Sequence, residues 1–256
     1  MMATPTHPIH FVGAGPGDPE LITVRGQRLL AEADLVVYAG SLVPRALVDG
    51  LAAAVHDSAG LHLGEIIELM AAAWQQGQRV VRLHTGDPSI YGAIKEQMAA
   101  LDSRKIPYQV VPGVSSATAT AAALQAELTL PEVSQTVIIT RRAGRTPVPE
   151  GQDLVSLAGH QATMLILLSV GMIGEVVADL QSGGYPAETP VAVVEKVSWP
   201  EQRILRGTLS SIAAQVEEAG INKTAIIAVG RVFAELPPAA LSRLYDKEFS
   251  HGCRQA

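Results

Sequence analysis

The sequence lacks the features that several broad functional classes require. Its one cysteine, Cys253, excludes a disulfide framework and a cysteine-based metal site. No apolar run approaches the roughly 18 residues of a membrane-spanning helix. The net charge of −6 disfavours a general electrostatic role with nucleic acid. The first residues, MMATPTHP, lack the apolar core of a signal peptide, so we expect a soluble cytoplasmic protein.

A glycine-rich loop follows the first apolar segment, and it fails as a phosphate-binding loop. The stretch GAGPGDPELIT runs from Gly13 to Thr23. A dinucleotide fingerprint needs a third glycine where this chain has Asp18, whose negative charge would repel a pyrophosphate. Pro16 removes an amide N–H that a phosphate cradle would use. A Walker lysine is also missing, so a nucleotide enzyme of the NAD or ATP type is disfavoured.

A second loop repeats this layout. In RVVRLHTGDPSIYG, an apolar strand again leads into a tight turn, and Gly86-Asp87-Pro88 echoes Gly17-Asp18-Pro19. Loops that follow parallel strands meet at the carboxyl edge of the sheet, so the pair predicts one site there. The alternative is that Gly-Asp-Pro is only good turn chemistry.

The alternation of strands and helices predicts an α/β fold. With 256 residues, of which 48% are hydrophobic, the chain is long enough for one or two domains. We expect strands at 9–12, 35–38, 79–83, 108–111, 135–140, 163–168, 191–196 and 225–229. We expect helices at 20–33, 62–76, 89–101, 116–126, 173–181 and 210–219. Parallel pairing should be substantial, although the long loops of the second half also allow antiparallel pairs.

Five stretches together resemble the tetrapyrrole methyltransferase family. They are GAGPGDPELIT, the GDP loop with the segment after it, PGVSSA (Pro112 to Ala117), TPVAVVEKVSWPEQ (Thr189 to Gln202) and TAIIAVGRV (Thr224 to Val232). Two more, HTGDPSIYGAIKEQM and LTLPEVSQTVIITRRAGRTPVPE, are similar to the precorrin-4 C-11 methyltransferase group of cobalamin biosynthesis. The resemblance covers residues 9 to 232.

The resemblance implies the tetrapyrrole methylase fold, with two α/β domains and an active-site cleft between them. We place the amino-terminal domain at 9–118, the carboxy-terminal domain at 119–232 and a peripheral tail at 233–256. It also implies a homodimer that uses S-adenosylmethionine (SAM) and methylates carbon 11 of an anionic tetrapyrrole, precorrin-4 or cobalt-precorrin-4.

The family's cofactor contacts carry over onto six parts of this chain. The residues implied are Pro16, Thr85, Gly86, Asp87, Ile90, Ser115, Ser116, Leu168, Lys196, Ala225 and Ile226. Some have a simpler alternative: Asp87 and one of the two serines would cap helices, and Leu168 would pack in the core. SAM carries no phosphate, which agrees with loops that suit a phosphate poorly.

A basic loop is the candidate binding site for the substrate's carboxylates. Arg141, Arg142 and Arg145 lie close together in TRRAGRTP, and guanidinium groups bind carboxylates bidentately. The alternative is a solvated basic loop. We also expect His62, Tyr91 and Lys95 to line the same trough.

The sequence does not identify a general base. His84, Glu195 and Asp18 are candidates, and structural hydrogen bonding is the alternative for each. No metal site is expected. Three other functions stay open: methylation of another corrin carbon or of uroporphyrinogen III, methylation of a non-tetrapyrrole substrate, and binding of SAM without catalysis. The sequence does not decide whether the substrate contains cobalt.

Overall fold

The chain folds as two compact units. The computed structural model describes Pro5, residues 7–234 and Ser250. Unit 1 holds the described residues up to Ala119 together with Ser198–Pro200, and unit 2 holds Thr120–Val197 and those from Glu201 onward. Cys253 and nearly all of the expected tail 233–256 lie outside the described residues.

Unit 1 is built on a parallel five-stranded sheet. Its spatial order is β3 (Ala54–Asp57), β2 (Leu35–Tyr38), β4 (Val80–His84), β1 (Ile9–Gly13) and β5 (Tyr108–Val111). Every neighbouring pair is parallel. The carboxyl ends of β1, β4 and β5 therefore share one edge, which brings the loops after these strands together.

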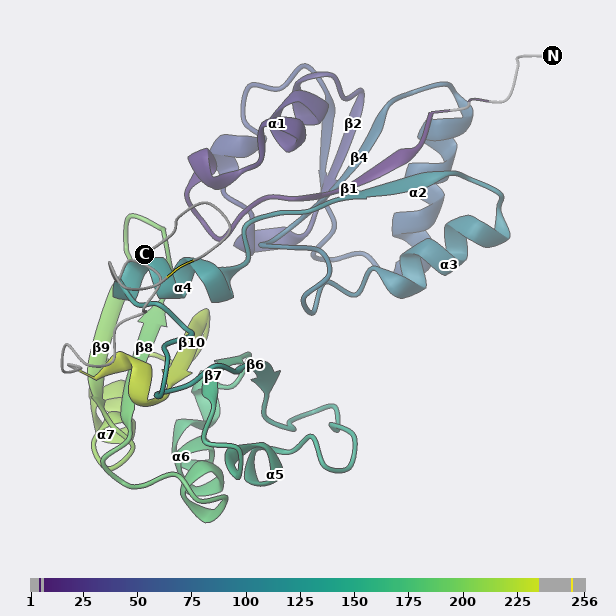
Figure 1. Cartoon of the computed structure of the whole chain (residues 1–256). Helices are drawn as coiled ribbons and strands as arrows, with labels where there is room; N and C mark the ends of the chain where they lie inside the picture. The colour runs from purple at the N-terminus through teal and green to yellow at the C-terminus, as the bar shows by residue number, and fades with distance from the viewer. Residues whose placement is uncertain (1–4, 6, 235–249, 251–256) are drawn as a thin grey trace. The chain divides into compact units, whose positions relative to one another are not determined.

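Helices cover both faces of this sheet (Figure 1). The helices of the amino-terminal half are α1 (Val24–Ala31), α2 (Leu63–Gln75) and α3 (Lys95–Ser103). Alternate residues of a strand point to opposite faces, so Ile9 and Phe11 pack with α2 whereas Val12 packs on the α1 side. The His62 ring accepts the Glu65 N–H while the Glu65 carboxylate accepts the His62 N–H, a capping box that starts α2.

Unit 2 has a mixed sheet. Its order is β6 (Val137–Arg141), β7 (Thr163–Leu167), β10 (Ala225–Val229), β8 (Pro190–Glu195) and β9 (Arg203–Thr208). Only β6 and β7 pair in parallel, and the other pairs are antiparallel. Three helices, α5 (Leu154–Ala158), α6 (Ile173–Ser182) and α7 (Ile212–Glu218), pack against this sheet (Figure 1).

The remaining elements are short or join the units. Helix α4 (Ser116–Leu124) spans the boundary between units 1 and 2. The 3-10 turns are η1 (Pro19–Leu21), η2 (Gly40–Leu42), η3 (Arg45–Leu47), η4 (Val170–Met172) and η5 (Arg231–Phe233). No helix in the described part of the chain is long and apolar enough to cross a membrane.

The predicted α/β fold class is confirmed, and two helix predictions need correction. The helix expected at 20–33 begins only at Val24, because Thr23 caps it and the residues before it form η1. The helix expected at 89–101 begins only at Lys95. Tyr91 and Ala93 have φ of 54° and 49°, a left-handed conformation that no α-helix contains.

Two strands and one helix were not predicted. β3 and β9 lie at sheet edges, where the side chains of β3 are all exposed and none of β9 is buried. Such strands show no alternation of apolar and polar residues, so their sequence signal is weak. α5 has only five residues, too few for a helical period to show.

Candidate functional site

The two Gly-Asp-Pro loops of unit 1 are held to each other by their backbones. Gly86 N–H donates to the Gly15 carbonyl at 2.8 Å, and Gly15 N–H donates back to Gly86 at 3.3 Å. Ala14 N–H donates to the His84 carbonyl at 2.7 Å. The loops after β1 and β4 thus form one continuous backbone surface, as two strand-end loops at one sheet edge predict.

A third loop closes on these two through glycines. A Cβ on Gly13 would lie 2.6 Å from both the Gly113 Cα and the Gly86 carbonyl oxygen. A Cβ on Gly113 would clash with the same Gly86 oxygen. Any side chain at Gly13 or Gly113 would therefore force the ends of β1, β4 and β5 apart, and glycine is required by the close approach of three backbones.

Asp87 fastens the GDP loop to the loop after β5. Its carboxylate accepts the N–H and the hydroxyl of Ser89 on one oxygen and the Gly113 N–H at 2.9 Å on the other. Burial by itself raises the pKa of Asp87, but these hydrogen bonds outweigh it and hold the pKa below its usual value. The carboxylate therefore stays ionised at neutral pH. The alternative of a helix cap is wrong, because α3 begins eight residues later at Lys95.

The other expected cofactor residues of unit 1 lie around the same edge. Thr85 and Ile90 are half-buried, and Pro16 is buried. Ser115 caps α4, since its Oγ accepts the Ala117 N–H at 3.2 Å. The capping alternative therefore holds for Ser115, whereas Ser116 is the first residue of α4 and half-buried.

Trp199 contacts the first loop, and sequence reasoning missed it as a site residue. Its indole N–H donates to the Pro16 carbonyl at 3.0 Å, and Asp18 N–H donates to the Ser198 hydroxyl at 2.9 Å. A Cβ on Gly17 would overlap the indole ring. The only available signal was the Trp in TPVAVVEKVSWPEQ. Within unit 1, Ser198 and Trp199 fix the shape of the loop that carries Pro16.

In unit 2, the remaining expected cofactor residues gather at one edge of the mixed sheet. The pairing of Ile227 with Ile166 puts the start of β10 beside the end of β7, where Leu168 follows. Ala225 pairs with Glu195 at the end of β8, and Lys196 N–H donates to the Thr224 carbonyl at 2.8 Å. The Ala225 and Ile226 side chains are buried, so these two residues offer a ligand only backbone groups.

Leu168 is unfavourable in two ways, in its exposure to solvent and in its backbone conformation. Its side chain is 69% exposed although it is apolar, and its φ is 58°. Core packing, the alternative weighed for this residue, is therefore wrong. Left-handed non-glycine residues cost roughly 1 kcal/mol or more and are concentrated at functional sites. An exposed leucine held in this conformation is well suited to contact a flat apolar ligand surface.

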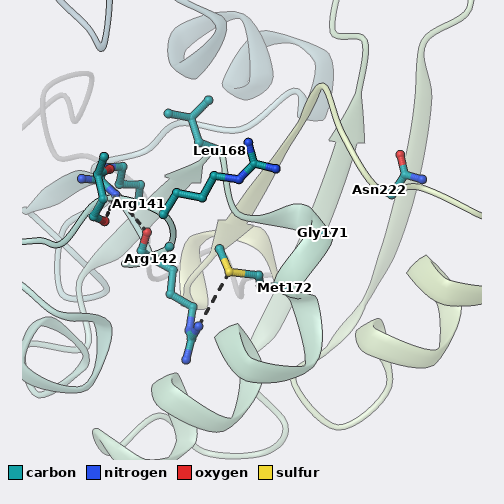
Figure 2. A pocket seen from close by; sticks show the side chains of 9 residues that line it. Arg141, Arg142, Leu168, Gly171, Met172 and Asn222 are labelled. Carbon is teal, nitrogen blue, oxygen red and sulfur yellow. Dashed lines mark hydrogen bonds between the residues drawn. The ribbon is translucent and has the colours of Figure 1, made fainter.

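Leu168 shares a cavity with the basic loop. The cavity measures about 490 Å³ and lies wholly in unit 2, at the carboxyl ends of β6 and β7 (Figure 2). Its lining consists of Arg141, Arg142, Gly144, Arg145, Thr146, Leu168, Gly171, Met172 and Asn222. The structure therefore brings all three predicted substrate arginines to one pocket. Met172 and Asn222 were not predicted, because neither lies in a recognisable motif.

The three arginines differ in how much hydrogen-bonding capacity they have left. Arg141 donates to the backbone carbonyls of its own loop, the best of them Pro147 at 2.8 Å. Arg142 forms an ion pair with Asp179 at 2.6 Å and contacts the Met172 sulfur (Figure 2). Arg145 is exposed, and within the described chain its side chain has no hydrogen bond or ion pair. Arg141 and Arg142 therefore stabilise the loop, and the Arg145 guanidinium is available to bind a ligand.

Each candidate base is already engaged or inaccessible. The His84 side chain is 3% exposed, and burial, with a smaller contribution from Arg82, lowers its pKa to about 3. Glu195 pairs with Arg203 at 2.6 Å. The Asp18 carboxylate accepts the Glu20 N–H at 2.9 Å. The geometry thus favours structural hydrogen bonding for Glu195 and Asp18, whereas His84 is buried and its Nε2 has no hydrogen-bond partner within the described residues.

The described residues contain no cluster of three or more histidine, cysteine, aspartate or glutamate side chains able to hold a metal ion. The polar groups at the two sheet edges are instead mostly backbone amides and carbonyls, together with the Asp87 carboxylate and the Arg145 guanidinium. Such a set suits an organic ligand with many polar groups better than a cation.

Comparisons with known proteins identify relatives over nearly the whole chain. The model of the tetrapyrrole (corrin/porphyrin) methylases matches residues 8–213. The cobalt-precorrin-4 C(11)-methyltransferase of Methanocaldococcus jannaschii is 55% identical over 96% of this chain and 95% of that protein. The precorrin-4 C(11)-methyltransferase of Pseudomonas aeruginosa is 50% identical over 95% of this chain and 97% of that protein.

Solved structures agree with the sequence relatives. The cobalt precorrin-4 methyltransferase CbiF superposes with a TM-score of 0.87 at 44% identity, over 89% of this chain and 96% of that one. The uroporphyrin-III C-methyl transferase of Thermus thermophilus, in complex with S-adenosyl homocysteine, gives a TM-score of 0.74 at 28% identity. That match covers 90% of this chain and 96% of the other.

Proposed function

The chain belongs to the tetrapyrrole (corrin/porphyrin) methylase family, and on that premise we propose that it methylates carbon 11 of precorrin-4 or cobalt-precorrin-4 with SAM as donor. The observation that carries the proposal is the identity of 55% and 50% to two precorrin-4 C(11)-methyltransferases, each aligned over almost its full length. The arginine pocket supports it, because the substrate is a polyanion. The alternatives of another corrin carbon or uroporphyrinogen III remain as outcomes of the test.

The residues at the two sheet edges fit SAM. The donor has an adenine, a ribose, an amino acid and a sulfonium, and no phosphate. The backbone surface of Gly15 and Gly86 offers N–H and C=O groups without a cationic cradle, and the ionised Asp87 suits an ammonium or ribose hydroxyls. Leu168 offers an exposed apolar surface for adenine, beside the backbone of Ala225 and Ile226. We assign these residues, with Pro16, Thr85, Ile90, Ser115, Ser116 and Lys196, to the cofactor.

Methyl transfer from SAM depends on the positioning of the reactants more than on proton transfer by the protein. When bound, SAM supplies an electrophilic methyl group whose departure leaves a neutral thioether. Because a neutral thioether would leave when an electron-rich ring carbon accepted this methyl group, the protein would not have to stabilise negative charge on a leaving group. Alignment of the reactants and exclusion of water can supply most of the rate. This agrees with the burial of His84 and with the engagement of Glu195 and Asp18 in other contacts.

The basic loop is the proposed anchor for the carboxylates of the macrocycle. Arg142 is fixed to Asp179, and Arg141 ties its loop together through three carbonyls. This rigid frame presents Arg145, whose side chain has no hydrogen bond or ion pair within the described residues, at the surface of the cavity. A preformed frame reduces the ordering cost of binding an acidic side chain. Arg145 is therefore the arginine on which we place substrate recognition.

Mass spectrometry of the reaction product tests the proposed function. The purified enzyme is incubated with SAM and, in separate reactions, with precorrin-4, cobalt-precorrin-4 and uroporphyrinogen III. A gain of one methyl group in either precorrin, located at carbon 11 by NMR of 13C-labelled product, is the expected result. Methylation of uroporphyrinogen III alone would refute the assignment. Parallel reactions on the two precorrins show which form the enzyme prefers.

We also propose that the enzyme is a cytoplasmic homodimer, as the family resemblance implies. Light scattering coupled to size-exclusion chromatography measures the mass directly, against 26.9 kDa for one chain. A mass of one chain at working concentrations would exclude the dimer. Fractionation of cells that express the tagged protein tests its location.

A further inference from the structure

A buried polar chain in unit 1 connects strand β4 to the far end of the GDP loop. Arg82 is 4% exposed, and its Nε donates to the Gln97 side-chain oxygen at 3.0 Å. The Gln97 side-chain nitrogen in turn donates to the Ala93 carbonyl at 3.0 Å. Gln97 is 5% exposed and belongs to α3. The chain Arg82–Gln97–Ala93 therefore joins a core strand to the loop.

The environment of Arg82 makes this arrangement costly. Its Nη1 donates to the Ser58 hydroxyl at 2.9 Å and to the Val37 carbonyl at 3.2 Å, so every hydrogen-bond acceptor assigned to it is neutral. Burial lowers the pKa of Arg82 to about 10 against the opposing effect of the Asp57 carboxylate, so the guanidinium stays charged at neutral pH. Within the described residues Arg82 forms no ion pair, so the nearby Asp57 carboxylate offsets only part of the cost of burying its charge. Replacing a buried polar pair of this kind by apolar side chains is often neutral or stabilising. The cost indicates a role beyond stability of the core.

The segment that this chain reaches needs external support. Tyr91 and Ala93 have left-handed backbones, and Ile94 provides no side-chain cap for the start of α3. Such backbone strain persists only where surrounding contacts over-determine the conformation. Asp87 fixes the first part of the loop through Ser89 and Gly113. Gln97 fixes the last part through Ala93.

We propose that Arg82 and Gln97 are positioning residues for the cofactor, holding the segment 86–94 in the conformation that SAM requires. The inference rests on the proposed function, because it assigns Thr85, Gly86, Asp87 and Ile90 to SAM. Neither side chain touches the ligand. They act through the Ala93 carbonyl, which sets where the loop lies between Asp87 and α3.

The test separates positioning from stability with three variants. Gln97→Leu removes the anchor and leaves the Arg82 Nε–H without its acceptor, while Nη1 keeps Ser58 and Val37. The double variant Arg82→Met/Gln97→Leu removes the anchor but replaces the whole polar pair by apolar groups, which preserves folding. Leu101→Ala is the matched control, since Leu101 lies one turn further along α3 and is fully buried, but faces the core.

Calorimetric titration with S-adenosylhomocysteine measures the effect. We expect the double variant to unfold near the wild-type urea midpoint while binding about tenfold more weakly, as the loss of one buried anchor predicts. Leu101→Ala should unfold earlier yet bind within about twofold of wild type. Hydrogen exchange of residues 86–94 should rise in the double variant and not in the control.

Two results overturn the inference. One is a double variant that binds S-adenosylhomocysteine as wild type does, and the other is a control that loses affinity as much as the double variant. Failure of the wild type itself to bind S-adenosylhomocysteine would instead refute the proposed function. If Gln97→Leu alone does not fold, the double variant and the control still decide the question.

Discussion

Acid should destabilise unit 1 through a single buried histidine, His84. Its side chain is 3% exposed, and within the described chain its Nε2 has no hydrogen-bond partner. Burial first, and the nearby charge of Arg82 second, lower its pKa from 6.5 to about 3. Because the folded pKa is depressed, the unfolded chain binds one more proton between these two values. Stability therefore falls as the pH drops below 6.5 and stops falling through this group near pH 3.

The size of the effect follows from the two pKa values. One proton of difference gives a slope of about 1.4 kcal/mol per pH unit. Between pH 7.5 and 4.5, His84 should thus reduce the free energy of unfolding by about 3 kcal/mol. His84→Leu and His84→Phe remove the titrating group and should lose that much less over the same interval. Other groups that titrate do so in all three proteins and cancel in the difference.

Urea unfolding followed by tryptophan fluorescence measures this loss of stability in unit 1. The chain has two tryptophans, and both Trp74 and Trp199 lie in unit 1 with His84. Leu and Phe differ in size, so their packing energies at pH 7.5 will differ, but their pH dependence should agree. The reasoning is refuted if the wild type and both variants show parallel stability profiles between pH 7.5 and 4.5.

Three further substitutions test the site. Arg145→Ala should weaken precorrin binding by about tenfold, because one charge-assisted contact is lost, while SAM affinity stays nearly unchanged. Titration of each ligand into wild type and variant measures both affinities. Unaltered precorrin affinity would exclude the basic loop from the substrate site. Gly113→Ala places a methyl group against the Gly86 carbonyl and should cost about 2 kcal/mol or more in urea unfolding, together with a loss of SAM affinity. A fully stable Gly113→Ala protein would contradict the close approach of the three loops. Leu168→Gly removes a left-handed leucine, so stability should stay within about 1 kcal/mol of wild type. Its SAM affinity, measured by calorimetry, should fall because the apolar contact is lost, and unchanged affinity would exclude Leu168 from the adenine site.

The local features of the loops could be predicted from the sequence. Pro16, Asp18 and the missing third glycine already exclude a phosphate cradle, because these are properties of single residues in a turn. The apolar runs that became β1, β4, β7 and β10 were also recognisable. Buried strands carry continuous hydrophobic signals that depend little on what packs against them.

Elements whose conformation depends on distant contacts were predicted poorly. The start of α3 moved to Lys95 because Tyr91 and Ala93 adopt left-handed backbones, a choice stabilised by Gln97 and Asp87 rather than by local propensity. The edge strands β3 and β9 gave no alternating pattern, since few of their side chains are buried. Their place in a sheet is decided by the strand beside them.

The amino-acid sequence by itself determined the family, the α/β class and the presence of two Gly-Asp-Pro turns and of a basic loop. Only the tertiary structure decided which arginine of that loop is available. Arg142 is neutralised by Asp179, which lies 37 residues away in the chain, while Arg145 has no such partner in the described residues. The three arginines of this segment cannot be distinguished from the sequence, because each carries the same charge. Whether a guanidinium stays available for a ligand depends on the fold, because the fold decides which groups come within hydrogen-bonding distance of it.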